Sequence, residues 1–292
     1  MNCIFCHKDS SNSKSIEHII PESLGNKHHF LPKGYVCDEC NNYFAIKVEK
    51  ELLSQPYFIS MRSRNEIQTK KGNLPRQKIV FPDIMKNTEV VLQTTRKGLT
   101  ISLNDEKIFE AIKAGNIEKL MVPYIPEPEY PNKTMSRFLA KCAYEFFLFN
   151  MGKENYDLCV QDLLCKKYDI LKKLREFARY GKGECWQYSQ RRIYSEGQIV
   201  YNPDNKKIYE KLNEMKFFIR DHKNLPNGDI EAEIYFVVAI AGIEYAICIS
   251  NPDISEYQQW IKEHNGLSPL INMEINPFSL SNVNPMLIKI QQ

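Results

Sequence analysis

Two Cys-x-x-Cys pairs near the N-terminus constrain the fold of this chain more than any other feature. They are Cys3 with Cys6 and Cys37 with Cys40. A tight turn brings both sulfurs of such a pair to one side, so two pairs can supply four thiolates to a tetrahedral zinc ion. We therefore expect a structural zinc site. Because a four-thiolate site is closed to substrate, a zinc ribbon used only for protein contacts is the alternative.

The insert between the pairs carries an acidic residue and a histidine side by side, Glu17 and His18, followed by Ile-Ile-Pro. Metal-assisted hydrolysis of a phosphodiester needs a carboxylate that binds a divalent cation and a base that deprotonates water. An imidazole suits the second role because its pKa lies near neutral pH. Neighbours in a regular strand face opposite ways, so a shared site requires irregular backbone. Alone, such a pair is often an ordinary surface feature.

Asn41 directly follows the last cysteine and stands at the start of a run with helical periodicity. One interpretation is that Asn41 caps the helix. The other, which the context favours, is that its amide oxygen binds the same cation as Glu17. The run predicts a helix over residues 41–54, stopped by Pro56, in which the apolar side chains recur every four residues: Phe44, Val48 and Leu52.

Together, Cys-x-x-Cys, the segment Glu-His-Ile-Ile-Pro-Glu-Ser-Leu-Gly and Cys-x-x-Cys-Asn resemble the HNH endonucleases over about residues 3–55. The resemblance implies a small ββα-metal core, similar to a treble clef, that zinc holds together. It implies that His18 is the general base and that Glu17 and Asn41 bind the catalytic cation, Mg²⁺ or Mn²⁺. By the same resemblance, the structural zinc ligands are Cys3, Cys6, Cys37 and Cys40.

The chain departs from the family pattern at one position. The family has a central Asn that braces the loop carrying the base, a few residues before Cys37, and residues 30–34 contain none. Asn26, His29 or the backbone alone could take this role. We expect His28 and His29 to form an exposed loop pair, and contact with a metal or a phosphate is the alternative.

The remainder of the chain predicts an α+β fold with two boundaries. Residues 62–78 contain six Lys or Arg and one acid, which is typical of a basic linker or arm. Prolines at 123, 126, 128 and 131 mark the second boundary. The expected domains are an HNH nuclease domain over 1–58, a basic linker with a β-hairpin and a helix over 59–125, and an α+β region over 126–292. The last could be a sensor, a DNA-gripping or a dimerisation module.

Periodicity places helices and strands in both later segments. The apolar stretch 234–249 contains Gly242 and Glu244 and many β-branched residues, which favours strand–turn–strand over a membrane helix. The expected helices are 105–114, 134–150, 158–180 and 256–263, and the expected strands are 88–95, 98–103, 186–194, 199–201, 217–220, 230–240, 243–250 and 286–290.

Residues 166–192 combine nine Lys or Arg with three acids. Two interpretations stay open. The aromatic side chains between the charges could stack on an unpaired base, or the segment is an amphipathic helix with a solvated basic face and its aromatics in the core. The aromatic residues are Tyr168, Phe177, Tyr180, Trp186 and Tyr188.

Charge and cysteine usage bound the function. The net charge of +3 permits nucleic-acid binding without requiring it. The first residues lack the features of a signal peptide. The odd count of nine cysteines, with four in paired spacing and five single, favours metal-bound thiolates in a reducing cytoplasm over disulfides. We therefore expect a cytoplasmic, metal-dependent HNH endonuclease with no membrane segment.

The expected partner of this enzyme is DNA, with RNA less favoured. By analogy alone, an enzyme of this size resembles bacterial restriction or anti-phage defence effectors, acting as a homodimer or with a partner protein of the defence system. The alternative function is a non-catalytic zinc-ribbon protein that binds nucleic acid or serves as an adaptor.

Overall fold

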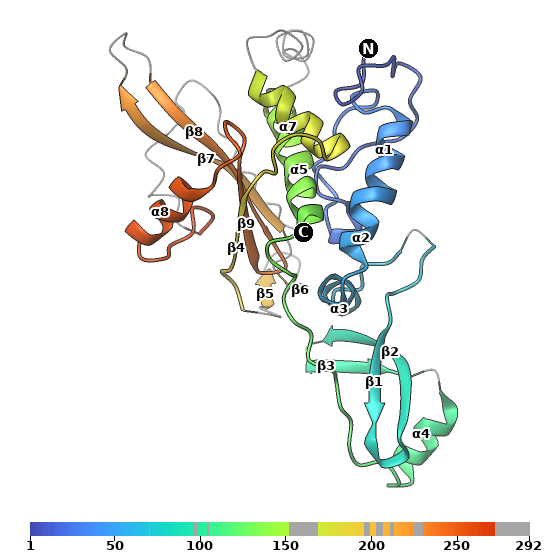
Figure 1. The fold of residues 1–292 in the computed structure, drawn as a ribbon. Helices are drawn as coiled ribbons and strands as arrows, with labels where there is room; N and C mark the ends of the chain where they lie inside the picture. Colours follow the sequence, from blue (N-terminus) through green and yellow to red (C-terminus); the bar gives the residue numbers. More distant parts are fainter. Residues whose placement is uncertain are drawn as a thin grey trace.

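The structure is a computed structural model, and it describes residues 1–69, 71–95, 98–103, 105–151, 169–195, 199–202, 207–210, 213–224 and 230–271. Helices and strands both contribute, so the predicted α+β class is confirmed. Figure 1 shows an N-terminal unit in blue, a small lobe below it, and a larger sheet with its helices. The helix predicted from residue 158 is described only from residue 169, and the strand at 286–290 lies outside the described residues.

The N-terminal unit contains three consecutive helical segments, and their predicted apolar face is confirmed. Phe44, Val48 and Leu52 are fully buried. Their four-residue repeat keeps them on one side of the helix, where they join the main hydrophobic core. The segments are α1 (Asp38–Phe44), the π-helical η2 (Ala45–Glu49) and α2 (Lys50–Leu53).

The predicted start of this helix needs correction. The helix begins at Asp38, and its N-cap is Cys37, whose sulfur accepts a hydrogen bond from the Cys40 amide at 3.4 Å. Asn41 therefore lies inside α1 and does not cap it. The helix does end before Pro56, but Pro56 then opens α3 (Pro56–Arg64). Proline fits there because the first helical position needs no N–H donor.

The two strands expected in the N-terminal unit are absent from its described residues, and one of its isolated bridges joins His18 to Phe30. Two backbone hydrogen bonds flank it, from Ile19 N to His29 O at 3.1 Å and from Leu31 N to Glu17 O at 2.8 Å. Between them lies the short 3-10 helix η1 (Glu22–Leu24). The backbone that carries Glu17 and His18 is therefore irregular, as a site shared by two neighbouring residues requires. Residues 16–31 are called the site loop below.

The small lobe has a hydrophobic core of its own, built from Ile79, Phe81, Val90, Ile108 and Ile117. The predicted hairpin and the helix that follows it are confirmed. The elements are β1 (Gln77–Phe81), η3 (Pro82–Ile84), β2 (Lys86–Thr95), β3 (Gly98–Ser102) and α4 (Glu106–Lys113), with the sheet order β1-β2-β3, antiparallel.

The expectation of a basic linker or arm over 62–78 is partly wrong. Its first residues complete α3, where Ser60, Met61 and Arg62 are buried. Its last two residues begin β1, a strand that the charge count did not suggest. Tertiary packing accounts for the first end of this segment, because the hydroxyl of Tyr57 in α3 donates to Ala241 O at 2.6 Å and ties α3 to the C-terminal region.

A four-stranded antiparallel sheet forms the C-terminal region, with the strand order β4-β9-β8-β7. The predicted hairpin is confirmed: β8 and β9 turn at Ala241 and Gly242, which both have positive φ. The elements are α5 (Lys133–Met151), α7 (Asp169–Tyr180), β4 (Tyr188–Arg192), the ribbon of β5 (Ile199–Asn202) and β6 (Lys207–Glu210), β7 (Asn213–Asn224), β8 (Ile230–Ile240), β9 (Ile243–Cys248) and α8 (Ser255–Glu263).

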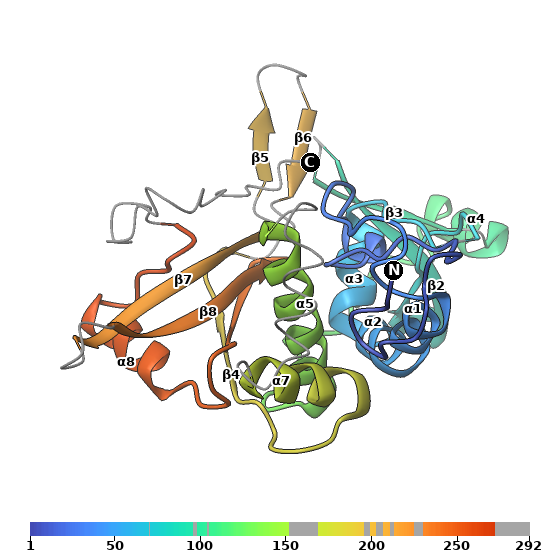
Figure 2. The same cartoon turned by 90° about the horizontal axis from the view of Figure 1, so that it is seen from above.

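Helix α5 lies between this sheet and the N-terminal unit, as Figure 2 shows from above. Successive side chains of β8 alternate between two layers. Phe236 and Val238 belong to the core shared with α5 and the N-terminal unit, whereas Tyr235 and Val237 pack in the core beneath α8. The N-terminal unit thus shares one hydrophobic core with the C-terminal region. None of the described helices has both the length and the apolar composition that crossing a bilayer requires.

The amphipathic interpretation of residues 166–192 agrees with their burial. Phe177, Trp186 and Tyr188 are at most 3 % exposed, so they cannot stack on a nucleic-acid base without unfolding. Tyr180 is 45 % exposed, and residue 168 lies outside the described part of the chain. The basic face of α7 is divided, since Lys172 and Lys173 are exposed while two of its arginines are buried against the N-terminal unit.

Candidate functional site

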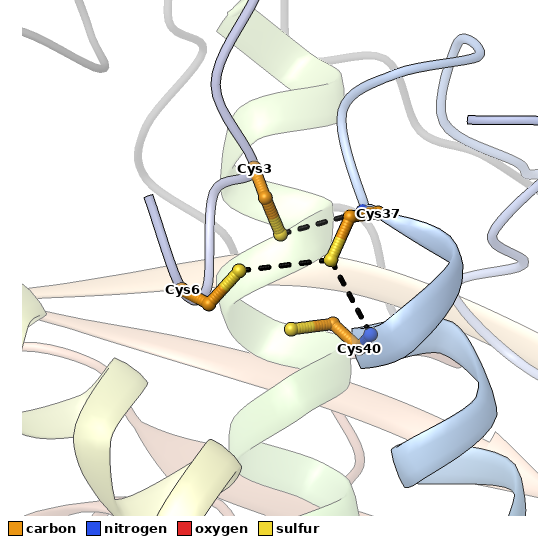
Figure 3. A group of neighbouring side chains, drawn as sticks. All are labelled: Cys3, Cys6, Cys37 and Cys40. Atoms are coloured by element: carbon orange, nitrogen blue, oxygen red, sulfur yellow. Dashed lines mark hydrogen bonds between the residues drawn. The ribbon is translucent and has the colours of Figure 1, made fainter. Parts of the chain in front are cut away.

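Four cysteine thiols converge at the start of α1. Figure 3 shows the sulfurs of Cys3 and Cys6 facing those of Cys37 and Cys40. All four sulfurs lie within 4.8 Å of one another, and those of Cys6 and Cys37 are 3.6 Å apart. Tetrahedral zinc with bonds of about 2.3 Å requires sulfurs about 3.8 Å apart. The predicted set of thiols therefore fits a structural zinc ion.

The ionisation of these thiols also points to a cation. A hydrogen bond from the Cys40 thiol lowers the pKa of Cys3 to about 4. The same bond and burial raise the pKa of Cys40, and burial raises the pKa of Cys6 to about 11. Four thiolates cannot coexist here without a bound cation, so metal binding would release protons. Arg179 of α7 donates from Nε to the Cys40 sulfur at 3.3 Å and stacks on Tyr43.

A cleft of about 1080 Å³ opens beside the site loop. Glu17, His18 and Asn41 all line it, so the three residues predicted for catalysis face one space. Glu17 is 5 % exposed, whereas His18 and Asn41 are half-buried. A substrate in the cleft can therefore reach the histidine and the amide directly, and the carboxylate forms part of the floor.

Asn26 braces the site loop. Its side chain is fully buried and makes four hydrogen bonds to backbone atoms. Its Nδ2 donates to Ile20 O at 2.7 Å and to His29 O at 2.8 Å, and its Oδ1 accepts from the amides of His28 at 3.1 Å and His29 at 3.0 Å. Of the alternatives for the missing central Asn, the structure thus favours Asn26. A buried amide with both ends satisfied is rigid, so it holds the bridge beside His18 in place.

The expectation that His28 and His29 form an exposed pair is half wrong. His28 is exposed, but His29 is 8 % exposed and packs edge-on against Phe149 at 5.5 Å. Burial lowers the pKa of His29 to about 4. The side chain of His29 is therefore a neutral part of the core, placed there because its backbone pairs with Ile19.

A buried lysine from α5 meets the predicted metal ligand Glu17. Lys141 Nζ lies 2.6 Å from Glu17 Oε1, 3.3 Å from Glu49 and 3.2 Å from Glu145. Burial by itself would lower the pKa of Lys141, but the three carboxylates raise it well above its usual value. Burial also raises the pKa of Glu17 to about 7, against the opposing effect of Lys141. One ammonium cannot neutralise three carboxylates, so a further cation would be favourable here.

Helix α5 also holds the backbone of the site loop. Lys141 Nζ donates to His18 O at 3.1 Å, and the Cys142 thiol donates to Ile19 O at 3.0 Å. At the other end, Asp38 accepts hydrogen bonds from the amides of Lys14 at 3.0 Å and Ser15 at 2.8 Å. The loop is fixed on one side by α1, which carries Cys40, and on the other by α5.

Asn41 faces the cleft from the second turn of the helical segments. Its Nδ2 donates to Ile16 O at 3.2 Å. Among the described residues no hydrogen bond to its Oδ1 is found, so that oxygen is available to a ligand. Ala45 and Glu49 follow at four-residue intervals and line the same cleft. Glu49 was not predicted as a site residue, and this spacing from Asn41 is the signal that could have found it.

The four cysteines form the one set of three or more His, Cys, Asp or Glu ligand atoms close enough to share an ion in the described ranges. A cation in the cleft would therefore be held by few protein ligands. Mg²⁺ is commonly bound in this way, through one or two carboxylates with water and substrate phosphate oxygens completing its shell. Glu17 or Glu49 with Asn41 Oδ1 supply oxygen ligands of the required kind.

Comparison with known proteins agrees with this geometry. Residues 3–56 match a family model described as HNH endonuclease. No curated protein and no solved structure matches the chain. The N-terminal unit is therefore an HNH endonuclease domain, with the four clustered cysteines as its candidate zinc site. An HNH domain indicates a nuclease of the hydrolase class with a nucleic-acid substrate.

Proposed function

We propose that this protein is a metal-dependent endonuclease that hydrolyses phosphodiester bonds, most readily in DNA. The observation that carries the proposal is the cleft that Glu17, His18 and Asn41 line together, next to but separate from the cysteine cluster. Zinc bound to the four thiols would have no open position, so the chemistry belongs to the cleft.

In this proposal His18 is the general base. Its imidazole is half-buried at the cleft, and its backbone is fixed on both faces, by the bridge to Phe30 and by Lys141. It would accept a proton from the attacking water. Glu17 and Asn41 would hold Mg²⁺ or Mn²⁺, which supplies charge stabilisation for the departing 3′-oxygen. Lys141 opposes protonation of the Glu17 carboxylate and holds it in one orientation.

The test is cleavage of supercoiled plasmid by the purified chain. Mg²⁺ or Mn²⁺ should give nicked and then linear DNA, and omission of the cation should stop the reaction. A parallel incubation with structured RNA measures the preference for DNA. Binding of the plasmid without nicking at any cation concentration would support the non-catalytic zinc-ribbon protein instead. Faster cleavage of the RNA would make RNA the substrate.

A role in restriction or anti-phage defence, an action as a homodimer or with a partner protein of a defence system, and a location in the cytoplasm stay predictions. The structure of the C-terminal region supports a narrower proposal: through α5 it stabilises the site loop, because Lys141 and Cys142 bind that loop directly.

A further inference from the structure

Arg62 has an unusual environment for a charged side chain. It lies in α3, beyond the end of the HNH family match, and it lines the cleft together with Glu17, His18 and Asn41. Its side chain is only 8 % exposed. None of the residues proposed for catalysis accounts for a buried guanidinium at this place.

Among the residues that the structure describes, no carboxylate forms an ion pair with Arg62, and no oxygen accepts a hydrogen bond from its side chain. Its Nε is fully buried without a partner. Burial is the one cause that acts on the pKa of Arg62, and it lowers it. The guanidinium thus has no neighbouring negative charge to compensate it.

Three other arginines have partners, whereas the Nε of Arg175 is buried without one although its Nη atoms contact His7 and Glu176. Arg191 pairs with Glu244 at 2.5 Å, and Arg192 pairs with Glu127 at 2.5 Å. Arg179, which is about as buried as Arg62, donates to the Cys40 sulfur. A buried charge without a partner costs folding free energy, and proteins keep such groups where a ligand completes them.

We propose that Arg62 binds a backbone phosphate of the nucleic acid that occupies the cleft. The proposal rests on the proposed nuclease function and adds to it a substrate-binding residue outside the family domain. The planar guanidinium matches two oxygens of a phosphate. Lys27 and Lys50 line the same cleft among its four glutamates, and they add positive charge for a phosphate backbone beside Arg62.

Both acidic and basic side chains line the cleft. Glu17 and Glu49 offer oxygen ligands for a cation, and Arg62 offers donors for an anion. A phosphodiester bound at a divalent cation has neighbouring phosphates along its strand, and Arg62 would hold one of them. Arg62 therefore acts as a positioning residue that fixes the strand in the cleft.

The experiment compares Arg62→Gln and Arg62→Lys with the control Arg64→Gln. Arg64 belongs to the same helix, but it donates to Ser60 at 2.8 Å and does not line the cleft. Binding of a 30-base-pair duplex is measured against salt concentration without added divalent cation. The slope of log K against log salt is negative. Arg62→Gln should make it less steep by about 0.9, which corresponds to one phosphate contact, and Arg62→Lys should largely restore the wild-type slope.

Two further readouts separate substrate binding from a structural role. Plasmid cleavage by Arg62→Gln should fall about 10- to 100-fold, mainly through KM, with Arg62→Lys intermediate. The Tm of Arg62→Gln should rise by about 2–4 °C, because an uncompensated buried charge is removed. An unchanged salt slope, or a Tm that falls in both Arg62 variants, overturns the proposal.

Failure of the nuclease assignment gives a different set of results from failure of the Arg62 proposal. If the wild-type chain does not cleave plasmid but Arg62→Gln still loses one unit of salt slope, the nuclease assignment is wrong and Arg62 nevertheless binds phosphate. If the wild-type chain cleaves and the Arg62 variants bind and cleave as the Arg64→Gln control does, the nuclease assignment holds and the role of Arg62 is wrong.

Discussion

Lys141 Nζ lies 2.6 Å from Glu17 Oε1, and both side chains are buried. The lysine belongs to α5 and the glutamate to the site loop, so this contact joins the C-terminal region to the nuclease domain. It fixes the carboxylate that we propose as a metal ligand. Because Lys141 also binds the carbonyl of His18, one ammonium group positions two of the three proposed catalytic residues.

Lys141→Met should therefore destabilise the protein as well as inactivate it. The change leaves the buried carboxylates of Glu17 and Glu145 without a cation, which typically costs about 3–5 kcal/mol. Urea denaturation of the full chain measures this cost. Lys133→Met in the same helix is the control, since Lys133 is exposed. Adding Glu145→Gln to Lys141→Met should recover part of the loss, and equal stability of Lys141→Met and Lys133→Met would contradict the proposed role.

Asn26→Ala should disturb the site loop more than its small volume suggests. Four hydrogen bonds are lost, each with a net value of about 0.5–1.5 kcal/mol, so a loss of roughly 2–6 kcal/mol is expected. Asn26→Asp keeps the acceptor but places a buried carboxylate oxygen against the carbonyl oxygens of Ile20 and His29, so it should destabilise the protein at least as much as Asn26→Ala. Asn42→Ala, an exposed position in α1, is the control. Denaturation curves that superimpose for all three variants would show that the brace is unimportant.

The purified chain should contain one zinc ion, and Cys40→Ser should lose it. The closed four-thiolate site holds α1 against the N-terminal turn, so loss of zinc should lower the Tm by roughly 6–12 °C. Cys185→Ser is the matched control, because Cys185 is exposed and lies outside the cluster. Elemental analysis and thermal denaturation are the measurements. Full zinc content in Cys40→Ser would remove that thiol from the ligand set.

Stability should fall in mild acid because of His29. Its folded pKa of about 4 lies below the unfolded value of about 6.5, so the unfolded state binds more protons between these pH values. The contribution is complete above pH 6.5, and up to about 3 kcal/mol is lost as the pH falls to about 4. His29→Leu should flatten this part of the curve, whereas His28→Leu should not. Parallel curves for wild type and His29→Leu would contradict the assignment.

Local patterns predicted the zinc site and the helical face because their cause is local. The spacing of Cys3 and Cys6 sets a turn, and Phe44, Val48 and Leu52 share one side of a helix wherever the helix packs. The three proposed catalytic residues were also found from the sequence, through a resemblance that covers the same short stretch. That they line one cleft could be known only from the structure.

Lys141 and Arg62 escaped prediction for tertiary reasons. Lys141 and His18 are 123 residues apart in the chain, and nothing short of the packed α5 brings them together. A lysine and a glutamate four residues apart, Lys141 and Glu145, in the mainly apolar stretch 138–149 of the helix were a usable signal of a buried charge pair. Arg62 was counted with an exposed basic arm, because its neighbours in sequence are basic and the burial of α3 was not foreseen.

The most direct test of the proposed mechanism is His18→Ala. The imidazole lies at the cleft and not among the zinc thiols, so the variant should keep one zinc ion, its Tm within about 2 °C and its affinity for duplex DNA. Plasmid cleavage with Mg²⁺ should fall at least about 100-fold, the usual contribution of a general base. Cleavage at the wild-type rate by a folded, zinc-bound His18→Ala chain would contradict the central claim.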